Sequence, residues 1–202
     1  NYLIENYSYD KIMVVGYSLG GNMTLKYFGD HVKTISDKVS CGVAISVPVD
    51  LASSSRIMGT SKNKIYMYKF LRSLRKKILI KNQKYPDFKL DIKKLLKSKT
   101  FKEFDSLYTA PVSGFSGPED YWEKASSKPY LTLIKKPVLL ITSSDDPFLA
   151  EECYPIKEAE NSNYFYLEIT KHGGHVGFIS SLFSKKNRWL ENRILQFIKD
   201  ND

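Results

Sequence analysis

The chain is 202 residues long, carries a formal net charge of +9, and is 42% hydrophobic and 13% aromatic. This length and composition fit one folded domain or two small ones and exclude general disorder. No apolar run approaches the ~20 residues that a transmembrane helix needs. Cys41 and Cys153 are too few for a disulfide framework, and their spacing matches no metal site. These features exclude a zinc finger, a disulfide-rich secreted fold and a membrane-spanning helix.

The first strand is expected at residues 11–15 (KIMVV), a short β-branched apolar run that ends at a glycine. A helical pattern follows Gly20-Gly21 and continues through 24–28. Further buried strands are expected at 41–47, 137–142 and 164–169, and a closing helix at 186–198, with Trp189, Ile194 and Phe197 on one face. Strands separated by helices predict a parallel α/β sheet.

Between Asp50 and about Tyr130 the sequence shows helical patterns, interrupted by proline and glycine, and no persistent strand pattern. We interpret this stretch as a helical cap inserted into the α/β core. The expected organisation is a core formed by residues 1–50 and 130–202, with a cap insertion at 51–129.

The positive charge is concentrated in one segment of the expected cap. Nine basic residues and no acidic ones lie between Lys62 and Lys84, and without them the chain has 22 basic and 22 acidic residues. Apolar residues at steps of three and four predict an amphipathic helix here, with a stripe formed by Ile65, Tyr68, Leu71, Leu74 and Ile78.

Two interpretations of the basic helix at 62–84 stay open. Its apolar stripe can pack on the body while the lysines face water, or the helix can make peripheral contact with an anionic membrane or an acidic partner. We expect no nucleic-acid binding, because no recognised module with stacking aromatic residues accompanies the charge.

A G-x-S-x-G sequence, Gly16-Tyr17-Ser18-Leu19-Gly20, follows the first expected strand and precedes a helix. In this context the motif predicts a nucleophile elbow, a sharp turn that holds its serine in a strained conformation. We expect Gly16 and Gly20 to be required because side chains there would clash. Ser18 is then the candidate nucleophile, and the amide of Leu19 a candidate oxyanion donor. The alternative is an ordinary tight turn.

A serine hydroxyl needs a base, which in this chemistry is a histidine oriented by a carboxylate. His172 and His175 lie in a glycine-rich loop just after the fourth expected strand, whereas His31 ends the elbow helix and is interpreted as structural. Asp145 and Asp146 follow the third expected strand directly. We expect one of these aspartates to orient the base and the other to cap the next helix.

The sequence resembles the YheT-like α/β-hydrolases, a family of esterases and lipases related to abhydrolase-domain proteins. The resemblance rests on GYSLGGN at 16–22, FDSLYTAPVSGFSGPEDYW at 104–122, SSDDPF at 143–148 and GGHVGF at 173–178, and it spans most of the chain. It implies an α/β-hydrolase fold, with Ser18 as nucleophile, His175 as base and Asp146 as acid. Asp145 is the alternative acid and His172 the alternative base. The resemblance also places residues 108–121 beneath the cap, near an acyl pocket.

One feature departs from this family, which builds a second oxyanion donor and part of its sheet from sequence before the elbow. Only seventeen residues precede Ser18. We therefore expect the chain to correspond to the C-terminal part of such a hydrolase, with N-terminal strands missing and the first strand left with an open edge.

The expected function is a serine esterase or lipase that forms an acyl-serine intermediate on a lipid or other acyl ester, without metal or organic cofactor. An acyltransferase using the same triad is one alternative. The other is a non-catalytic hydrolase-like fragment or binding protein, since losing one oxyanion donor costs ~10²–10³ in rate. The compartment stays open between the cytoplasm and a membrane surface.

Overall fold

The computed structural model describes residues 2–85, 90–179 and 188–201. The chain forms two compact units, residues 1–49 with 126–202 and residues 50–125, which we call the sheet unit and the helical unit. The second boundary lies four residues before the one expected at 129/130. The reason is that the Ser127 amide donates to Asn22 Oδ1 at 2.9 Å and the Lys128 amide donates to the Val49 carbonyl at 3.1 Å. Residues 126–129 are thereby tied to the sheet unit.

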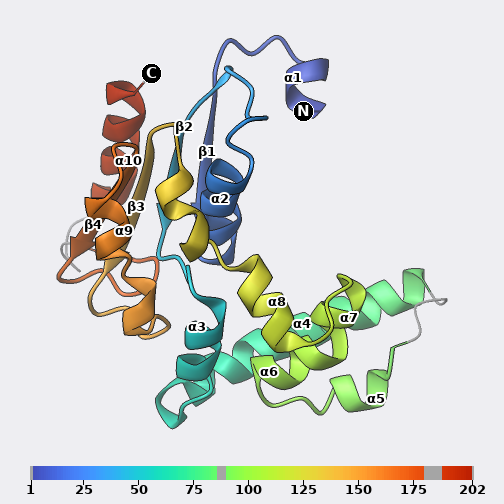
Figure 1. Cartoon of the computed structure of the whole chain (residues 1–202). Helices are drawn as coiled ribbons and strands as arrows, with labels where there is room; N and C mark the ends of the chain where they lie inside the picture. The colour runs from blue at the N-terminus through green and yellow to red at the C-terminus, as the bar shows by residue number, and fades with distance from the viewer. Residues whose placement is uncertain (1, 86–89, 180–187, 202) are drawn as a thin grey trace. The chain divides into compact units, whose positions relative to one another are not determined.

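The sheet unit contains a four-stranded sheet in the order β1-β2-β3-β4, and each neighbouring pair is parallel (Figure 1). The strands are β1 Ile12–Tyr17, β2 Val39–Ile45, β3 Val138–Ser143 and β4 Phe165–Thr170. All four expected strands are present, with ends shifted by one or two residues. Because the strands are parallel, their carboxyl ends meet at one edge of the sheet, where the candidate catalytic residues follow.

Two apolar clusters cover the two faces of this sheet. One contains Leu25 and Phe28 of α2 (Leu19–Asp30) and Cys153; the other contains Cys41 of β2 and Ile194 and Phe197 of α10 (Trp189–Asp200). The apolar face expected for the closing helix is confirmed, and Trp189 packs against it from the side. Lys186 and Asn187, where that helix was expected to begin, lie outside the described residues.

The remaining helices of the sheet unit are short. They are α1 Tyr2–Asn6, α9 Ile156–Glu160 and the 3₁₀ segments at Lys128–Leu133 and Glu151–Cys153. β1 forms one edge of the sheet, and its Met13 and Val15 are 38% and 42% exposed. This agrees with the open edge expected for the first strand.

The helical unit contains helices and turns throughout its described residues, as its sequence pattern predicts. Its helices are α3 Leu51–Met58, α4 Lys64–Lys84, α5 Ile92–Leu95, α6 Phe101–Phe104, α7 Ala110–Val112 and α8 Pro118–Ala125, with a 3₁₀ turn at Ser61–Asn63. Among the described residues, none of the helices combines the length and apolar character needed to cross a bilayer.

A π-helical turn, Asp105–Thr109, lies at the centre of the motif that carries the family resemblance. The Asp105 carboxylate accepts hydrogen bonds from the Thr109 hydroxyl at 2.6 Å and from the Trp122 indole nitrogen at 2.9 Å. Burial raises the pKa of Asp105, while these two hydrogen bonds oppose that shift. The motif therefore joins α6, the π turn and α8 inside the helical unit.

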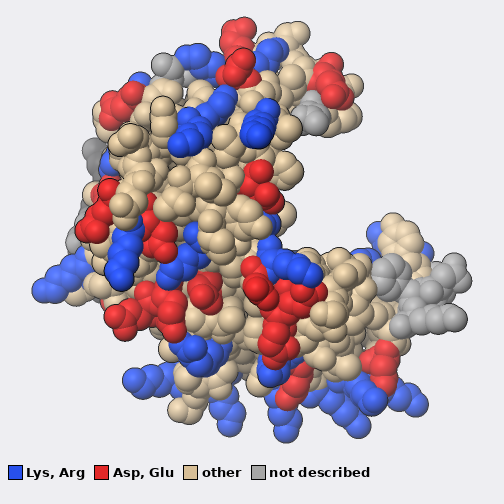
Figure 2. All heavy atoms as spheres, in the orientation of Figure 1, with Lys and Arg blue, Asp and Glu red and all other residues tan. Residues whose placement is uncertain are grey.

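The apolar stripe predicted for the basic helix is wrong for two of its five residues. α4 buries Met67, Leu71 and Ile78, whereas Ile65 and Tyr68 are 70% and 59% exposed. The buried face is thus rotated from the expected one, and exposed apolar side chains are interspersed with the lysines and arginines. Figure 2 shows basic side chains gathered along an edge of the helical unit.

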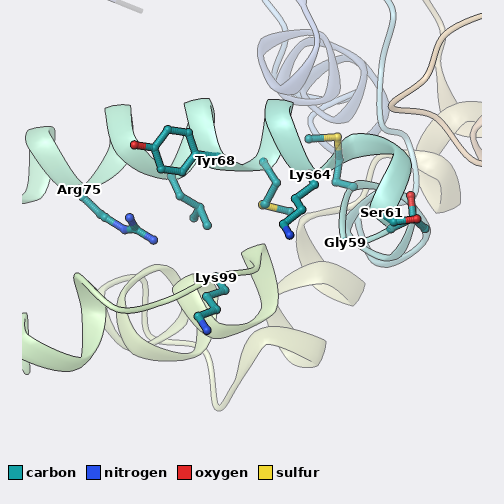
Figure 3. Close-up of a pocket in the computed structure, with 10 residues that line it drawn as sticks. Gly59, Ser61, Lys64, Tyr68, Arg75 and Lys99 are labelled. Carbon is teal, nitrogen blue, oxygen red and sulfur yellow. The ribbon is translucent and has the colours of Figure 1, made fainter.

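A cavity of about 320 Å³ lies within the helical unit, between α4 and the chain around Gly59 and Lys99 (Figure 3). Met58, Met67 and Leu71 form its buried wall. No sequence pattern indicated it, because its walls come from three separate segments.

Candidate active site

Ser18 stands between β1 and α2 in a left-handed backbone conformation, with φ 51° and ψ −121°. This is the strained turn that the elbow motif predicts, since a non-glycine residue rarely adopts positive φ. Its amide donates to the Ile45 carbonyl at 2.8 Å, which extends the β1–β2 ladder into the turn. Leu19 is the first residue of α2, where an amide has no acceptor within the helix and can serve an oxyanion.

The glycine requirement of this elbow is only partly the expected one. A Cβ at Gly16 would lie 2.4 Å from Thr24 Oγ1 and 2.5 Å from the Gly20 carbonyl oxygen, so this position must lack a side chain. Apart from its chain neighbours and its own helix backbone, a Cβ at Gly20 would meet no heavy atom of the described chain within 4 Å, so the expected clash there is wrong. Gly21 is the second crowded position, since its Cβ would lie 2.5 Å from Val47.

Asp146 and His175 form a close pair at the carboxyl ends of the strands, the same edge of the sheet at which Ser18 follows β1. His175 Nδ1 lies 2.8 Å from Asp146 Oδ2; the Asp146 side chain is fully buried and that of His175 is 15% exposed. The other carboxylate oxygen, Oδ1, accepts from the Phe148 amide at 2.9 Å, and the Phe148 ring lies 4.5 Å from the imidazole. An imidazole held through Nδ1 presents Nε2 as the atom that can accept a proton.

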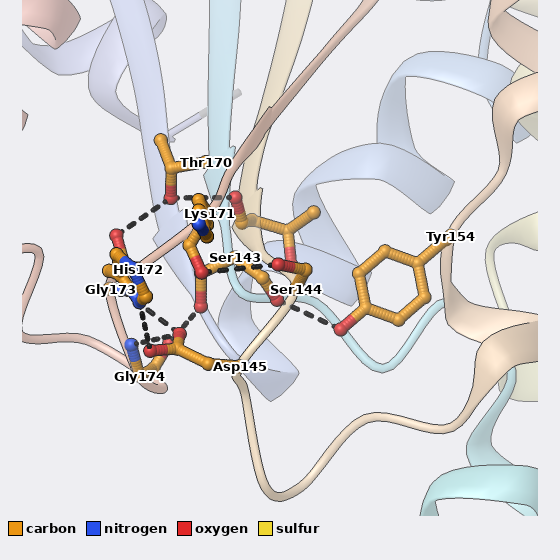
Figure 4. A network of polar contacts seen from close by, with 10 residues as sticks. Ser143, Ser144, Asp145, Tyr154, Thr170, Lys171, His172, Gly173 and Gly174 are labelled. Atoms are coloured by element: carbon orange, nitrogen blue, oxygen red, sulfur yellow. Dashed lines mark hydrogen bonds and ion pairs between the residues drawn. The ribbon is translucent and has the colours of Figure 1, made fainter.

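Asp145 has a different partner from the one expected. It was expected to cap the next helix if Asp146 oriented the base, but its Oδ1 accepts from the amides of Gly173 and Gly174 at 3.0 and 2.8 Å (Figure 4). The pKa of Asp145 is lowered, most strongly by the hydrogen bond from the Gly174 amide and next by the Ser143 side chain. The carboxylate therefore fixes the two glycines that precede His175.

The alternative base, His172, lies at the surface. Its side chain is 75% exposed and its Nδ1 is 3.5 Å from Asp145 Oδ2 rather than near Asp146. The geometry thus pairs His172 with Asp145 and His175 with Asp146, and the second of these pairs is the buried one.

Two further residues, Ser143 and Tyr154, hold the His175 loop and were missed by the sequence reasoning. The Ser143 hydroxyl donates to the Gly174 carbonyl at 2.6 Å, and the Tyr154 hydroxyl donates to the Ser143 carbonyl at 2.8 Å (Figure 4). Burial, with the negative charge of Asp146, raises the pKa of Tyr154 to about 12, so this phenol keeps its proton. Ser143 begins the SSDDPF motif, but that motif did not indicate this role, and Tyr154 lies outside the quoted motifs.

Ser46, at the end of β2, also has a left-handed backbone, with φ 51°. Its side chain is buried, and its hydroxyl has no hydrogen-bond partner in the described chain. Strained residues with unsatisfied polar groups concentrate at functional sites. The sequence around Ser46 carries no signal for this feature.

The structure does not connect all the candidate catalytic residues by hydrogen bonds. In the part of the chain that it describes, no hydrogen bond connects the Ser18 hydroxyl to the His175 imidazole. Catalytic hydrogen bonds in unliganded enzymes are often long and tighten only with substrate. No cluster of three or more histidine, cysteine, aspartate or glutamate side chains suited to a metal occurs among the described residues.

A family model described as the alpha/beta hydrolase fold matches residues 1–182 of this chain. The chain belongs to the α/β-hydrolase family. It is similar to the protein YheT of Escherichia coli, with 32% identity over 96% of this chain and 56% of YheT. It is also similar to the monoacylglycerol lipase of Saccharomyces cerevisiae, with 29% identity over 98% of this chain and 44% of the lipase. These likenesses agree with the YheT-like branch of the hydrolases.

Among solved structures, an esterase of Pyrococcus furiosus matches 99% of this chain and 57% of its own, with a TM-score of 0.55 and 20% identity. This likeness shows the hydrolase fold and nothing finer. The chain spans about half the length of the curated relatives it matches.

Proposed function

We propose that this chain carries the catalytic residues of a serine carboxylic-ester hydrolase. The observation that carries the proposal is the buried Asp146–His175 pair at 2.8 Å, at the sheet edge where Ser18 stands in a strained elbow. The curated relatives named as an esterase and a lipase support the same reaction class. A triad of this kind is recognised by geometry and by the role of each group.

In the proposed reaction, His175 Nε2 takes the Ser18 proton while Oγ forms a bond to the ester carbonyl carbon. The carbonyl electrons move to the oxygen, and the amide of Leu19 donates to that oxyanion. When the C–O bond of the ester breaks, the alcohol leaves with the proton from His175. Water then repeats the sequence on the acyl-serine and releases the acid. Asp146 orients the imidazole and stabilises its charged form.

The substrate is proposed to be a lipid or another acyl ester. Because the mechanism needs only side chains and backbone amides, it requires neither metal nor organic cofactor. Transfer of the acyl group to an alcohol or thiol would use the same residues, and adding such an acceptor to the assay distinguishes the two outcomes by their products.

A second candidate is a hydrolase-like protein without catalytic activity, favoured by the missing hydrogen bond between Ser18 and His175. A fluorophosphonate probe separates these candidates, because it labels only an activated serine. We expect labelling of the protein, loss of labelling in Ser18→Ala, and retention in His172→Gln, whose histidine lies at the surface. Labelling that persists in Ser18→Ala, or none in the unmodified protein together with no turnover of p-nitrophenyl esters, would contradict the proposal.

We also propose that α4 makes peripheral contact with anionic membranes. Ile65 and Ile80 are 70% and 46% exposed beside exposed Lys69, Lys76 and Lys77, so the outward surface of this helix is both apolar and basic. Such a surface suits the boundary between lipid headgroups and acyl chains.

A further inference from the structure

The cavity of the helical unit has an apolar wall and a cationic rim. Met58, Met67 and Leu71 are buried in its wall, and the exposed Tyr68 extends that wall outward. Lys64, Arg75 and Lys99 are its charged lining residues, and no aspartate or glutamate of the described chain lines it. In Figure 3 the side chains of Lys64 and Arg75 extend from α4 toward the segment that carries Lys99. At about 320 Å³ the cavity falls within the range of small-molecule sites.

Within the part of the chain that the structure describes, these three cations have no acidic partner. Among the described residues, no carboxylate forms an ion pair with Lys64, Arg75 or Lys99. Arg75 donates from Nη2 to the Ser98 carbonyl, but its buried Nε–H has no acceptor among residues 2–85, 90–179 and 188–201. A buried guanidinium donor without an acceptor is unusual, and it indicates that the site is incomplete as the protein alone forms it.

We propose that this cavity binds a single-chain anionic amphiphile, with a carboxylate or phosphate head at the three cations and an alkyl chain along the methionine and leucine wall. Three like charges around one opening attract an anion, and the apolar wall stabilises a chain removed from water. A bare inorganic anion would leave the wall uncovered, and a neutral amphiphile would leave the charges unpaired. This site lies within the helical unit and does not depend on the proposed hydrolase activity.

The test uses the whole chain and isothermal titration calorimetry. The four probes are decanoate, decyl phosphate, decyl maltoside and inorganic phosphate, and the amphiphiles are kept below their critical micelle concentrations. We expect decanoate, decyl phosphate or both to bind, and the tighter of the two assigns the head group. Octanoate in place of decanoate should bind more weakly, by up to about fourfold for each methylene removed from a buried chain.

Variants locate the binding in the cavity. Lys64→Ala with Lys99→Ala should weaken binding of the anionic probes about tenfold, the scale set by two partly exposed ion pairs. The matched control is Lys69→Ala with Lys97→Ala, two exposed lysines from the same segments that do not line the cavity. Tyr68→Ala should weaken binding of decanoate, whereas Tyr66→Ala, outside the lining, should not.

The Ser18→Ala protein provides a background in which catalysis cannot consume or mimic the signal, and binding there should be unchanged. The proposal is overturned if none of the probes binds, if decyl maltoside or inorganic phosphate binds as tightly as the anionic amphiphiles, or if the two lysine pairs have equal effects. Each of these results leaves the ester-hydrolase proposal intact, because that proposal rests on the sheet unit.

Discussion

The two units of this chain divide charge and chemistry between them. The helical unit contains 17 basic and 8 acidic residues, so it carries the whole net charge of +9, whereas the sheet unit contains 14 of each. The candidate catalytic residues, however, all lie in the neutral sheet unit. There polar groups act through individual short-range contacts such as Asp146–His175, while in the helical unit the charges act together as a basic surface.

Because their charges are arranged differently, the two units should respond to different perturbations. A short-range buried pair is screened little by salt, but an exposed basic surface is screened within about 10 Å at 0.1 M salt. Ester hydrolysis should therefore depend on single side chains, and surface association on total charge and ionic strength.

The largest expected effect comes from the two neighbouring aspartates. Asp146→Asn should lower ester hydrolysis about 10⁴-fold, because the amide no longer holds the imidazole in the required tautomer. Asp145→Asn should stay within about tenfold of the unmodified protein, because an amide oxygen can still accept from Gly173 and Gly174. Steady-state turnover of a p-nitrophenyl ester measures both. Equal losses would show that the structure assigns the acid wrongly.

The next effect tests whether the helical unit alone carries the membrane contact. Replacing Lys69, Lys76 and Lys77 by glutamine should weaken binding to vesicles that contain phosphatidylserine about 100-fold, at about 1 kcal/mol for each charge. Lys81 is kept, because its ammonium donates to the Tyr108 hydroxyl at 3.0 Å.

The control for this experiment removes three exposed lysines of the sheet unit, Lys33, Lys135 and Lys157, so that net charge falls equally. Vesicle co-sedimentation should show little change in this control, and hydrolysis of a water-soluble ester little change in either variant. A similar loss of vesicle binding in both variants would return α4 to a purely structural role.

A smaller effect separates the two glycines of the elbow. Gly16→Ala should destabilise the protein by about 1–3 kcal/mol, because its Cβ would overlap the Gly20 backbone. Gly20→Ala should be neutral or stabilise α2 by up to about 1 kcal/mol, since alanine favours a helix and finds open space there. Urea unfolding followed by circular dichroism compares them. A greater loss for Gly20→Ala would restore the requirement that the motif alone suggests.

The smallest effect concerns pH. The folded-state pKa of Asp145 is lowered, so its contribution to stability is present above the unfolded value near 3.8 and is lost as the pH falls through the folded value. Between about pH 4 and pH 2, the free energy of unfolding should therefore fall less steeply in Asp145→Asn than in the unmodified protein. Parallel curves would mean that the Gly173–Gly174 contacts do not depend on the charge.

Much of the sheet unit was predictable because its strands are continuous apolar runs and its chemistry follows the strand ends. The order of Ser18, Asp146 and His175 is visible in the sequence. Parallel strands bring their carboxyl ends to one edge of the sheet independently of the conformation of the loops. The choice between Asp145 and Asp146 could not be derived from spacing alone. It depends on which carboxylate turns into the interior, which the loop at Gly173–Gly174 decides.

The helical unit was less predictable for a related reason. Residues at steps of three and four define more than one face of α4, and tertiary packing selected the face of Met67 rather than that of Ile65. The cavity needs Lys99 to lie opposite α4, a contact between segments that no local pattern encodes. The order of the three candidate catalytic residues can be seen in the sequence itself, whereas these features require the folded unit.

Cys41 and Cys153 are the chain's two thiols. Both are buried in the sheet unit, each in the apolar cluster on a different face of the sheet. A thiol-specific reagent therefore reaches them only when that unit opens, and its reaction does not report motions of the helices at 50–125. Single Cys→Ala variants would let the rate of alkylation report the loosening of one layer at a time. The two cysteines thus serve as native probes of the rate at which the interior of the sheet unit becomes exposed, without any added label.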